Sequence, residues 1–284
     1  MKPAVRPPAQ RQGGFTLIEI LVALALLGVV LGLLVSFFTQ STRTSSQVST
    51  RAEMQEDILI TQQIIASRLR EAWAVLPPGT IVDFGSGALR RNPAAGNING
   101  SWEIGAHPLL ALILPPDAPQ LSCTATIRDG CYRFFAYYPV KRSTWVSGTS
   151  STSTRNPGPD PDNGDTWVLA EYTLYYDTPP ELLKLKEGLT TLDYSKSQVN
   201  LLADYVAPGI PTGTFTTAAN AYTMFSYSVV NEEVSGVTMP VVKGVTLRLA
   251  TARQQRGQLM RLPDATGTYT ITVFPKNLGK VAVQ

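Results

Sequence analysis

The chain is poor in the residues on which most catalytic centres depend. Its 284 residues include one histidine, His107, and two cysteines. His107 precedes a proline and has no metal-ligand spacing around it, so a histidine metal centre or a histidine-activated nucleophile has little support. The sequence also lacks a Gly-x-Ser-x-Gly turn, a phosphate-binding glycine loop and a His-Glu-x-x-His pair. We therefore predict no enzyme activity and no cofactor, although carboxylate pairs assembled only by folding remain open.

The sequence has no charged residue between Glu19 and Arg43. The apolar run over 15–38 has about two dozen residues, enough to cross a bilayer of roughly 30 Å. A secretory signal has a shorter apolar run followed by a small-residue cleavage site, but Thr39 to Arg43 contain no such site. A plain signal anchor does not account for Glu19, because a carboxylate at the bilayer centre costs about 2.5–3.5 kcal/mol.

A short basic leader precedes the apolar run. The formal net charge of +3 does not indicate nucleic-acid binding, because three of the 24 Lys and Arg residues lie at Lys2, Arg6 and Arg11. Their removal leaves 21 basic against 21 acidic residues. The leader charge instead favours a cytoplasmic position for that end of the chain. Gly13 and Gly14 then place a small-residue pair before the apolar helix rather than after it.

The segment Gly14-Phe15-Thr16-Leu17-Ile18-Glu19, followed by an apolar helix, resembles the class III signal of type IV prepilins and type II secretion pseudopilins. The resemblance implies cleavage between Gly14 and Phe15 by a prepilin peptidase, and methylation of the new amino terminus of Phe15. It also implies that Glu19, the fifth mature residue, pairs with the terminal ammonium of a neighbouring subunit. A buried carboxylate is tolerable when it is paired in this way.

The same resemblance implies a location and a set of partners. We expect a single-pass protein of the bacterial inner membrane, with its head in the periplasm or outside the cell, that later enters a periplasmic or cell-surface filament. Its partners would be the prepilin peptidase, other pilin or pseudopilin subunits through their N-terminal helices, an inner-membrane assembly platform, and lipid before assembly. DNA is a further candidate partner, without support of its own. Aromatic strand residues would stack on its bases, although packing in the core or sheet is the favoured use of these side chains. They are Tyr132, Phe134, Tyr137, Tyr175 and Tyr176.

The apolar helix is expected to continue beyond the membrane. We divide the chain into a leader (1–14), a transmembrane or filament-core helix (15–38), an amphipathic continuation (39–76) and a globular β-rich head (77–284). An apolar stripe recurs at helical spacing in the continuation, and Pro77-Pro78-Gly79 ends it. The stripe is Met54, Ile58, Ile65, Leu69, Ala72 and Leu76. Gly28 and Gly32 form a G-x-x-x-G pair. Such a pair can allow two helices to approach closely or loosen its own helix locally, and it also occurs in apolar helices by chance.

The head reads mainly as β-strands. Six segments are rich in β-branched and aromatic residues: 109–114, 132–140, 166–176, 222–230, 244–251 and 268–274. One long helix followed by many strands predicts an α+β fold with a mostly antiparallel sheet, the ladle shape of pilins. The last two segments also loosely resemble the carboxy-terminal region of PilW-like and GspJ-like minor subunits, with Lys276-Asn277 where those end in Arg-Asn.

Cys123 and Cys131 lie in the exported part, and an oxidising compartment favours a disulfide between them over two buried thiols. A second polar feature is the low-complexity segment 147–165, which predicts a solvated loop. Asp160, Asp162 and Asp165 there offer oxygens that calcium favours, although such acidic turns are usually turns alone. The position of the twelfth EF-hand ligand would be Glu171, inside a predicted strand.

Taken together, the residues and the resemblance predict a minor type IV pilin of the PilW type, which is cleaved and then joins or primes a pilus for adhesion, motility or DNA uptake. The absence of the proline that major pilins carry at the position of Ser36 agrees with a minor subunit. The alternative within this class is a GspJ-like minor pseudopilin of a type II secretion system. The distant alternative is a membrane-anchored hydrolase.

Overall fold

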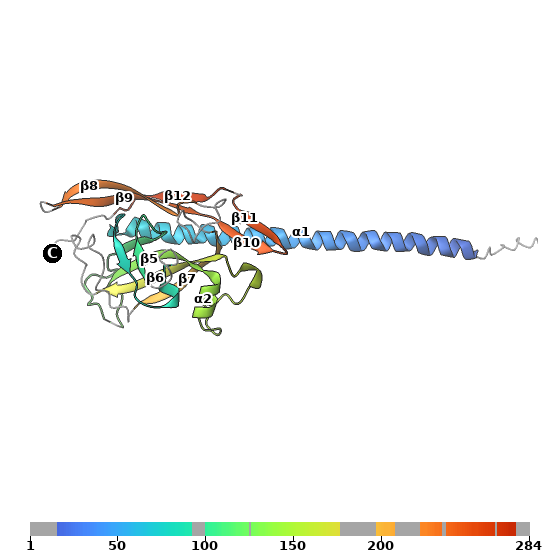
Figure 1. Cartoon of the computed structure of the whole chain (residues 1–284), viewed down its shortest axis with the longest axis horizontal. Coiled ribbons are helices and arrows are strands. Elements are labelled where there is room, and N and C mark those ends of the chain that lie inside the picture. The colour runs from blue at the N-terminus through green and yellow to red at the C-terminus, as the bar shows by residue number, and fades with distance from the viewer. Residues whose placement is uncertain are drawn as a thin grey trace, which may run out of the picture. The chain divides into compact units, whose positions relative to one another are not determined.

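The computed structural model describes residues 16–92, 100–124, 126–176, 197–207, 222–234, 237–264 and 266–276. It contains one long helix, α1 (Leu17–Glu71), followed by a β-rich head (Figure 1). By its internal contacts the chain divides into two compact units, residues 1–50 and residues 51–284. The Lys276-Asn277 pair lies partly outside the described residues, because Asn277 is not among them.

In the first unit, α1 carries its apolar side chains on the surface. Leu21, Leu31 and Phe38 are each more than half exposed. The Ser/Thr-rich stretch after them remains helical because its hydroxyls donate back to carbonyls one turn earlier, as Thr42 Oγ1 does to Phe38 O at 3.0 Å. Thr44 Oγ1 donates likewise to Gln40 O at 3.0 Å. The predicted continuation of the helix beyond residue 38 is therefore present.

The helix ends earlier than its apolar stripe predicts. Met54, Ile58, Ile65 and Leu69 are buried as expected, but α1 stops at Glu71. Ala72 and Leu76 are buried outside the helix, on either side of the short strand β1 (Ala74–Val75). The prediction that the helix reaches residue 76 is thus wrong, because β1 pairs with β4 (Leu110–Leu114) before the prolines are reached.

The head contains three antiparallel sheets among its described residues. The largest has seven strands in the order β1-β4-β5-β6-β7-β10-β11, the second has the order β12-β9-β8, and the third pairs β2 with β3. The remaining bounds are β2 (Ile81–Asp83), β3 (Ser101–Glu103), β5 (Tyr132–Lys141), β6 (Trp167–Tyr176), β7 (Gln198–Val206), β8 (Phe225–Val234), β9 (Val237–Leu249), β10 (Thr251–Gln255), β11 (Gln258–Leu262) and β12 (Tyr269–Val273). The α+β class and the antiparallel head agree with the prediction.

The predicted strands are found with shifted ends, and several elements are additional. The segments over 109–114, 132–140, 166–176 and 268–274 match β4, β5, β6 and β12 closely. β9 begins at Val237 rather than Gly244, and Thr251 belongs to β10. The predictions did not include β1, β2, β3, β7, β10, β11 or the short helix α2 (Arg142–Gly148).

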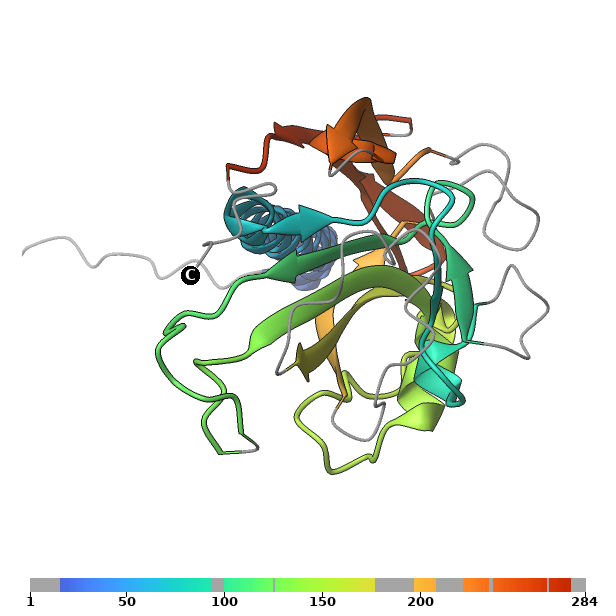
Figure 2. The same ribbon diagram turned by 90° about the vertical axis from the view of Figure 1, so that its left-hand side faces the viewer.

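The part of α1 that belongs to the head lies between its two larger sheets, as the end-on view shows (Figure 2). Ile58, Ile65 and Leu69 are fully buried in the common core. Two polar side chains of the same helix reach in opposite directions. Thr61 Oγ1 donates to Leu202 O of β7 at 3.4 Å, and Gln62 Nε2 donates to Tyr269 O of β12 at 2.6 Å.

A buried polar cluster fixes the helix on the larger sheet. Arg68 Nη1 donates to the Tyr137 hydroxyl at 2.8 Å and forms an ion pair with Glu171. Tyr137 and Glu171 are cross-strand neighbours on β5 and β6. The guanidinium of Arg68 also lies 4.2 Å from the ring centroid of Phe135. Burial raises the pKa of Tyr137 well above its usual range, so the hydroxyl stays neutral and accepts this hydrogen bond.

We predict that Arg68→Ala lowers the free energy of unfolding by about 2 kcal/mol or more, because it leaves Glu171 buried without its cation. The matched control is Arg70→Ala on the exposed side of the same helix, which should stay within about 0.5 kcal/mol of the parent. Denaturant unfolding of the full chain in detergent measures both values. Equal effects of the two substitutions would contradict the assigned role of the Arg68–Glu171 pair.

Candidate functional site

Thr16, the residue before α1, and Glu19 in the first turn of the helix form a reciprocal helix cap. Thr16 N and Thr16 Oγ1 donate to Glu19 Oε2 at 3.0 and 3.1 Å, and Glu19 N donates to Thr16 Oγ1 at 3.4 Å. This is a capping box, in which the first and fourth residues satisfy each other's backbone donors. The predicted cleavage and methylation positions, Gly14 and Phe15, lie outside the described residues, immediately before this cap.

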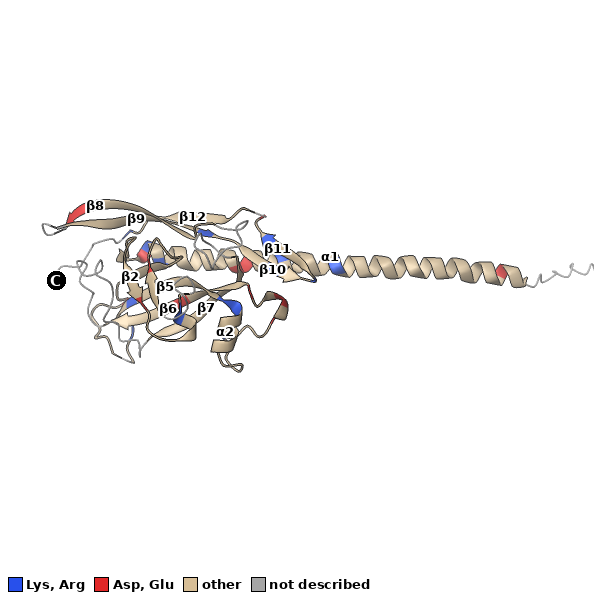
Figure 3. Cartoon of the chain, viewed as in Figure 1, with Lys and Arg blue, Asp and Glu red and all other residues tan. Residues whose placement is uncertain are grey.

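The carboxylate of Glu19 lies on an otherwise apolar stretch of surface. In the described part of the chain, its polar contacts are with Thr16. Two shallow hollows on the helix surface meet at Glu19, one against Ile20 and Leu24 and the other against Val22 and Leu26. Beyond Glu19, a long stretch of α1 carries no charge (Figure 3), and the next charged residue in the sequence is Arg43.

This geometry leaves the carboxylate only partly satisfied. The negative charge is well placed in the first turn, where the helix dipole favours it. Two hydrogen bonds from Thr16 do not supply a countercharge, so an apolar environment would still demand a cation. The cap itself was absent from our sequence predictions, although its signal, a threonine three residues before a glutamate at the start of an apolar run, is present in the sequence.

The helix that begins here is long and apolar enough to cross a membrane by length and composition. None of its most apolar 18-residue window is buried within the structure. Gly28 and Gly32 lie on this surface, and an added side chain at either would meet no atom within 4 Å. Contacts within one chain therefore do not require glycine at these positions. Close approach of a second helix at this pair stays a prediction.

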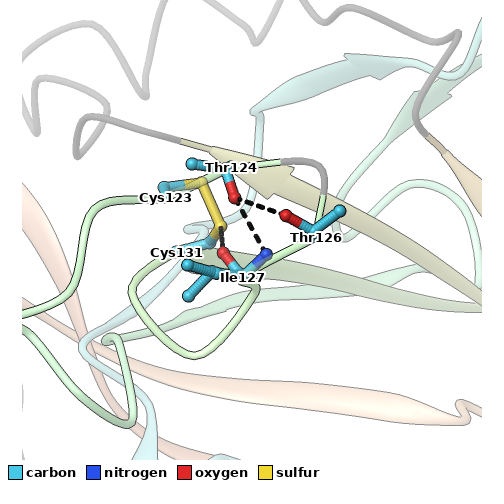
Figure 4. Close-up of a disulfide and its surroundings, with 5 residues drawn as sticks. All are labelled: Cys123, Thr124, Thr126, Ile127 and Cys131. Carbon is cyan, nitrogen blue, oxygen red and sulfur yellow. Dashed lines mark hydrogen bonds between the residues drawn. A yellow bond between two sulfur atoms is a disulfide. The ribbon is translucent and has the colours of Figure 1, made fainter.

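The two cysteines form the predicted disulfide (Figure 4). It closes the loop between β4 and β5, and Cys131 is buried next to its strand. Inside the loop, Ile127 N donates to Thr124 Oγ1 at 2.9 Å. Gly130 cannot be replaced without movement, because an added Cβ would lie 2.1 Å from Leu121 O. The bridge and the turn together join the described residues of this loop to the start of β5.

The candidate calcium residues are not brought together. Asp160 Oδ2 accepts from Tyr205 at 2.9 Å and from Asn163 at 3.0 Å, and Asp165 lies 3.4 Å from Lys141 Nζ. Asp162 is exposed in the short 3-10 turn Pro161–Asn163. Among the described residues, no three His, Cys, Asp or Glu side chains form a metal-binding group. Glu171, the notional twelfth ligand, is instead the partner of Arg68.

Most of the low-complexity segment is exposed, as predicted, but its end is also tied to the head through Asp160 and Asn163. The ring of Tyr205 is close to two guanidiniums, with Arg142 at 5.0 Å and Arg253 at 4.4 Å from its centroid. Arg142, almost fully buried, donates through Nε to both oxygens of Asp204. Asn163 bonds reciprocally with the backbone of Gln254 in β10, at 2.9 and 2.6 Å. No spacing pattern in the sequence predicts this cluster, because its members come from four segments.

The aromatic strand residues and the histidine have structural positions. Phe134 and Tyr137 are fully buried, while Tyr132, Tyr175 and Tyr176 are partly buried. An array of exposed stacking platforms for DNA is therefore not formed by these residues. His107 accepts a hydrogen bond from Glu103 N at 2.8 Å through Nδ1, which closes a turn. Burial lowers the pKa of His107, with Glu103 opposing the effect.

Comparisons with known proteins find a family-model match at the start of the chain and a relative that is similar in sequence over about half of its length. Residues 9–35 match the family model described as the prokaryotic N-terminal methylation motif. The chain is also 27% identical over 157 residues to a pilin-like protein, PilA3, of Thermus thermophilus. That match covers 53% of this chain and 60% of the relative, so the alignment spans somewhat over half of each protein. No solved structure matches the chain.

We predict that the Asp160 cluster stabilises the head down to acidic pH. Burial alone would raise the pKa of Asp160, but hydrogen bonds from Asn163 and Tyr205 and the nearby Arg142 and Arg253 lower it below its ordinary 3.8. Its contribution is therefore present above that value and is lost as the pH falls through the lowered pKa. Asp160→Asn should cost about 1 kcal/mol at neutral pH, and this deficit should shrink toward pH 3.

Thermal unfolding of the full chain across this pH range measures the deficit. Asp162→Asn, an exposed neighbour in the same turn, is the matched control and should follow the parent curve. A deficit for Asp160→Asn that stays constant down to pH 3, or one that Asp162→Asn shares, would count against the cluster.

Proposed function

We propose that this chain, a type IV pilin-like protein that carries the prepilin-type methylation motif, is a minor pilin that joins or primes a type IV pilus. The proposal rests on the position of Glu19, a single carboxylate at the start of an apolar helix that is long enough to cross a membrane. It follows Gly14-Phe15 within the segment that matches the methylation motif. We assign the chain a role in assembly, not in catalysis.

The proposed first step is trimming of the leader. A prepilin peptidase would cut between Gly14 and Phe15 and methylate the new amine of Phe15. Cutting there leaves the whole apolar helix on the mature chain and creates a cation at its tip. Within one subunit, Thr16 gives Glu19 hydrogen bonds but no positive charge. The terminal ammonium of a neighbouring subunit then supplies that charge. In the uncut precursor Phe15 has no such amine, so the leader blocks assembly.

Before assembly the chain would wait as a single-pass protein of the inner membrane, in contact with lipid. The basic leader favours a cytoplasmic start, which places the disulfide-containing head in the periplasm or outside the cell. An inner-membrane platform would then move the subunit into a filament, where other subunits replace lipid around the helix. In the head, the Arg68–Glu171 pair holds α1 on the larger sheet.

Three features support a minor subunit. Ser36 stands where the proline of major pilins falls, the head is large, and the two last predicted strands resemble those of PilW-like subunits. Adhesion, motility and DNA uptake are the candidate roles of such a pilus. The burial of Phe134 and Tyr137 removes one argument for direct DNA contact by this chain.

The alternative is a GspJ-like minor pseudopilin of a type II secretion system, to which the same signal and the same head resemblance apply. Genes neighbouring the coding sequence separate the two, since pilus or competence genes favour the first and secretion genes the second. Deletion scored in parallel for piliation, secretion and transformation tests the assignment in the cell.

We predict that Glu19→Gln is cut normally but enters filaments more than about tenfold less than the parent. The amide oxygen still caps Thr16, so the helix start is kept, while the terminal ammonium of the neighbour loses a charge partner at a cost of about 3–5 kcal/mol. Quantitative immunoblotting of sheared filaments against total processed chain measures incorporation.

Two matched controls separate charge from other effects. Thr16→Val removes the hydroxyl of the cap but keeps the carboxylate, and Glu56→Gln removes an exposed charge further along the same helix. Both should be incorporated nearly as the parent is. Normal incorporation of Glu19→Gln, or equal loss in Thr16→Val, would show that the charge of Glu19 is not what assembly requires.

A further inference from the structure

Several strands of the head lie at the edge of a sheet, and β8 and β11 are two of them. Within the described residues, β8 is paired with β9 alone and β11 with β10 alone. An unpaired strand edge offers a row of backbone donors and acceptors to another chain. Both edges also carry exposed aliphatic side chains, since Val229 is 39%, Val230 47% and Leu259 59% exposed.

The outer half of β8 projects beyond the rest of its sheet. β12 pairs with β9 only over Val245–Leu249, whereas β8 and β9 remain paired as far as Val234 and Val237. From Val229 onward β8 therefore belongs to a two-stranded ribbon, and consecutive valines are exposed on its two faces. Such ribbons are marginal alone and gain from an added strand.

The two edges carry opposite charge. Glu232 and Glu233 lie near the free end of β8, and Lys243 balances only Glu232, at 2.6 Å. At the other edge, Arg256 is exposed in the tight turn between β10 and β11. Its φ of 51°, followed by 77° at Gly257, keeps the turn to two residues and holds Arg256 at the tip of the hairpin. Arg261 on β11 is instead bonded to the carbonyl of Gly267 at 2.8 Å.

We propose that the β8 edge of one copy of this chain adds to the β11 edge of a second copy. Val230 and Leu259 would supply apolar contact, and Glu233 would face the positive charge of Arg256. Figure 1 places the outer end of β8 and the β10–β11 turn at opposite ends of the head. The contact joins unlike surfaces, so copies add head to tail and each added head leaves a free edge for the next. The inference rests on the proposed function, because a row of heads is useful to a filament subunit.

The test uses the full chain, purified in detergent, in two differently tagged forms. One form carries Val230→Cys and the other Leu259→Cys, and a short bifunctional maleimide joins free thiols while the Cys123–Cys131 disulfide stays intact. Mixing the two forms should give a cross-linked mixed-tag dimer. Each form alone should give no cross-linked dimer, because its single new cysteine would face a native residue on the unlike edge of the next copy. Val230→Cys mixed with Ile81→Cys is the matched control, since Ile81 is 50% exposed on β2.

Charge reversal completes the test. Arg256→Glu in the Leu259→Cys form should reduce the mixed dimer several-fold, and Glu233→Arg in the other form should restore it. Cross-linking of either form with itself, a yield no higher than in the Ile81 control, or no rescue by the double reversal would overturn the proposal. The mass of the amino terminus in the same samples reports leader removal separately, so failure of the strand contact and failure of the pilin assignment give different results.

Discussion

The carboxylate of Glu19 needs a positive charge that the described chain does not place beside it. Thr16 donates two hydrogen bonds to it and thereby starts the helix, but the surrounding surface is apolar for several turns. In lipid or among packed helices, an unpaired carboxylate is costly. Our functional proposal follows from this need, because cleavage before Phe15 creates a cation one residue from the cap.

The head depends on a second acid–base contact, of a different kind. Arg68 of α1 meets Glu171 and Tyr137 inside the protein, where both partners are already present and fixed by neighbouring strands. Thr61 and Gln62 add polar contacts from the same helix to both larger sheets. Thus the Arg68 end of α1 has its charge partner within the head, whereas the described residues hold no cation beside Glu19 at the other end. This contrast is what we expect of a subunit that is folded before it assembles.

Much of this architecture follows from local sequence patterns, and the remainder comes from contacts between distant segments. The long helix, four of the strands and the Cys123–Cys131 bridge have clear signals in periodicity and spacing. The helix end at Glu71 could not be predicted, because the pairing of β1 with β4 overrides the apolar stripe. The same applies to Asp160, which the sequence presents as a calcium ligand but whose Oδ2 accepts hydrogen bonds from Tyr205 and Asn163. The Thr16–Glu19 cap, in contrast, was readable and was missed.

The most direct test of the central claim is the amino-terminal sequence and mass of the chain isolated from its own cells. The account predicts a chain that begins at Phe15 with a methyl group on its amine and retains the complete apolar helix. A chain that begins at Met1, or at a residue beyond Phe38, would contradict it, because Glu19 would then have no newly formed cation to pair with.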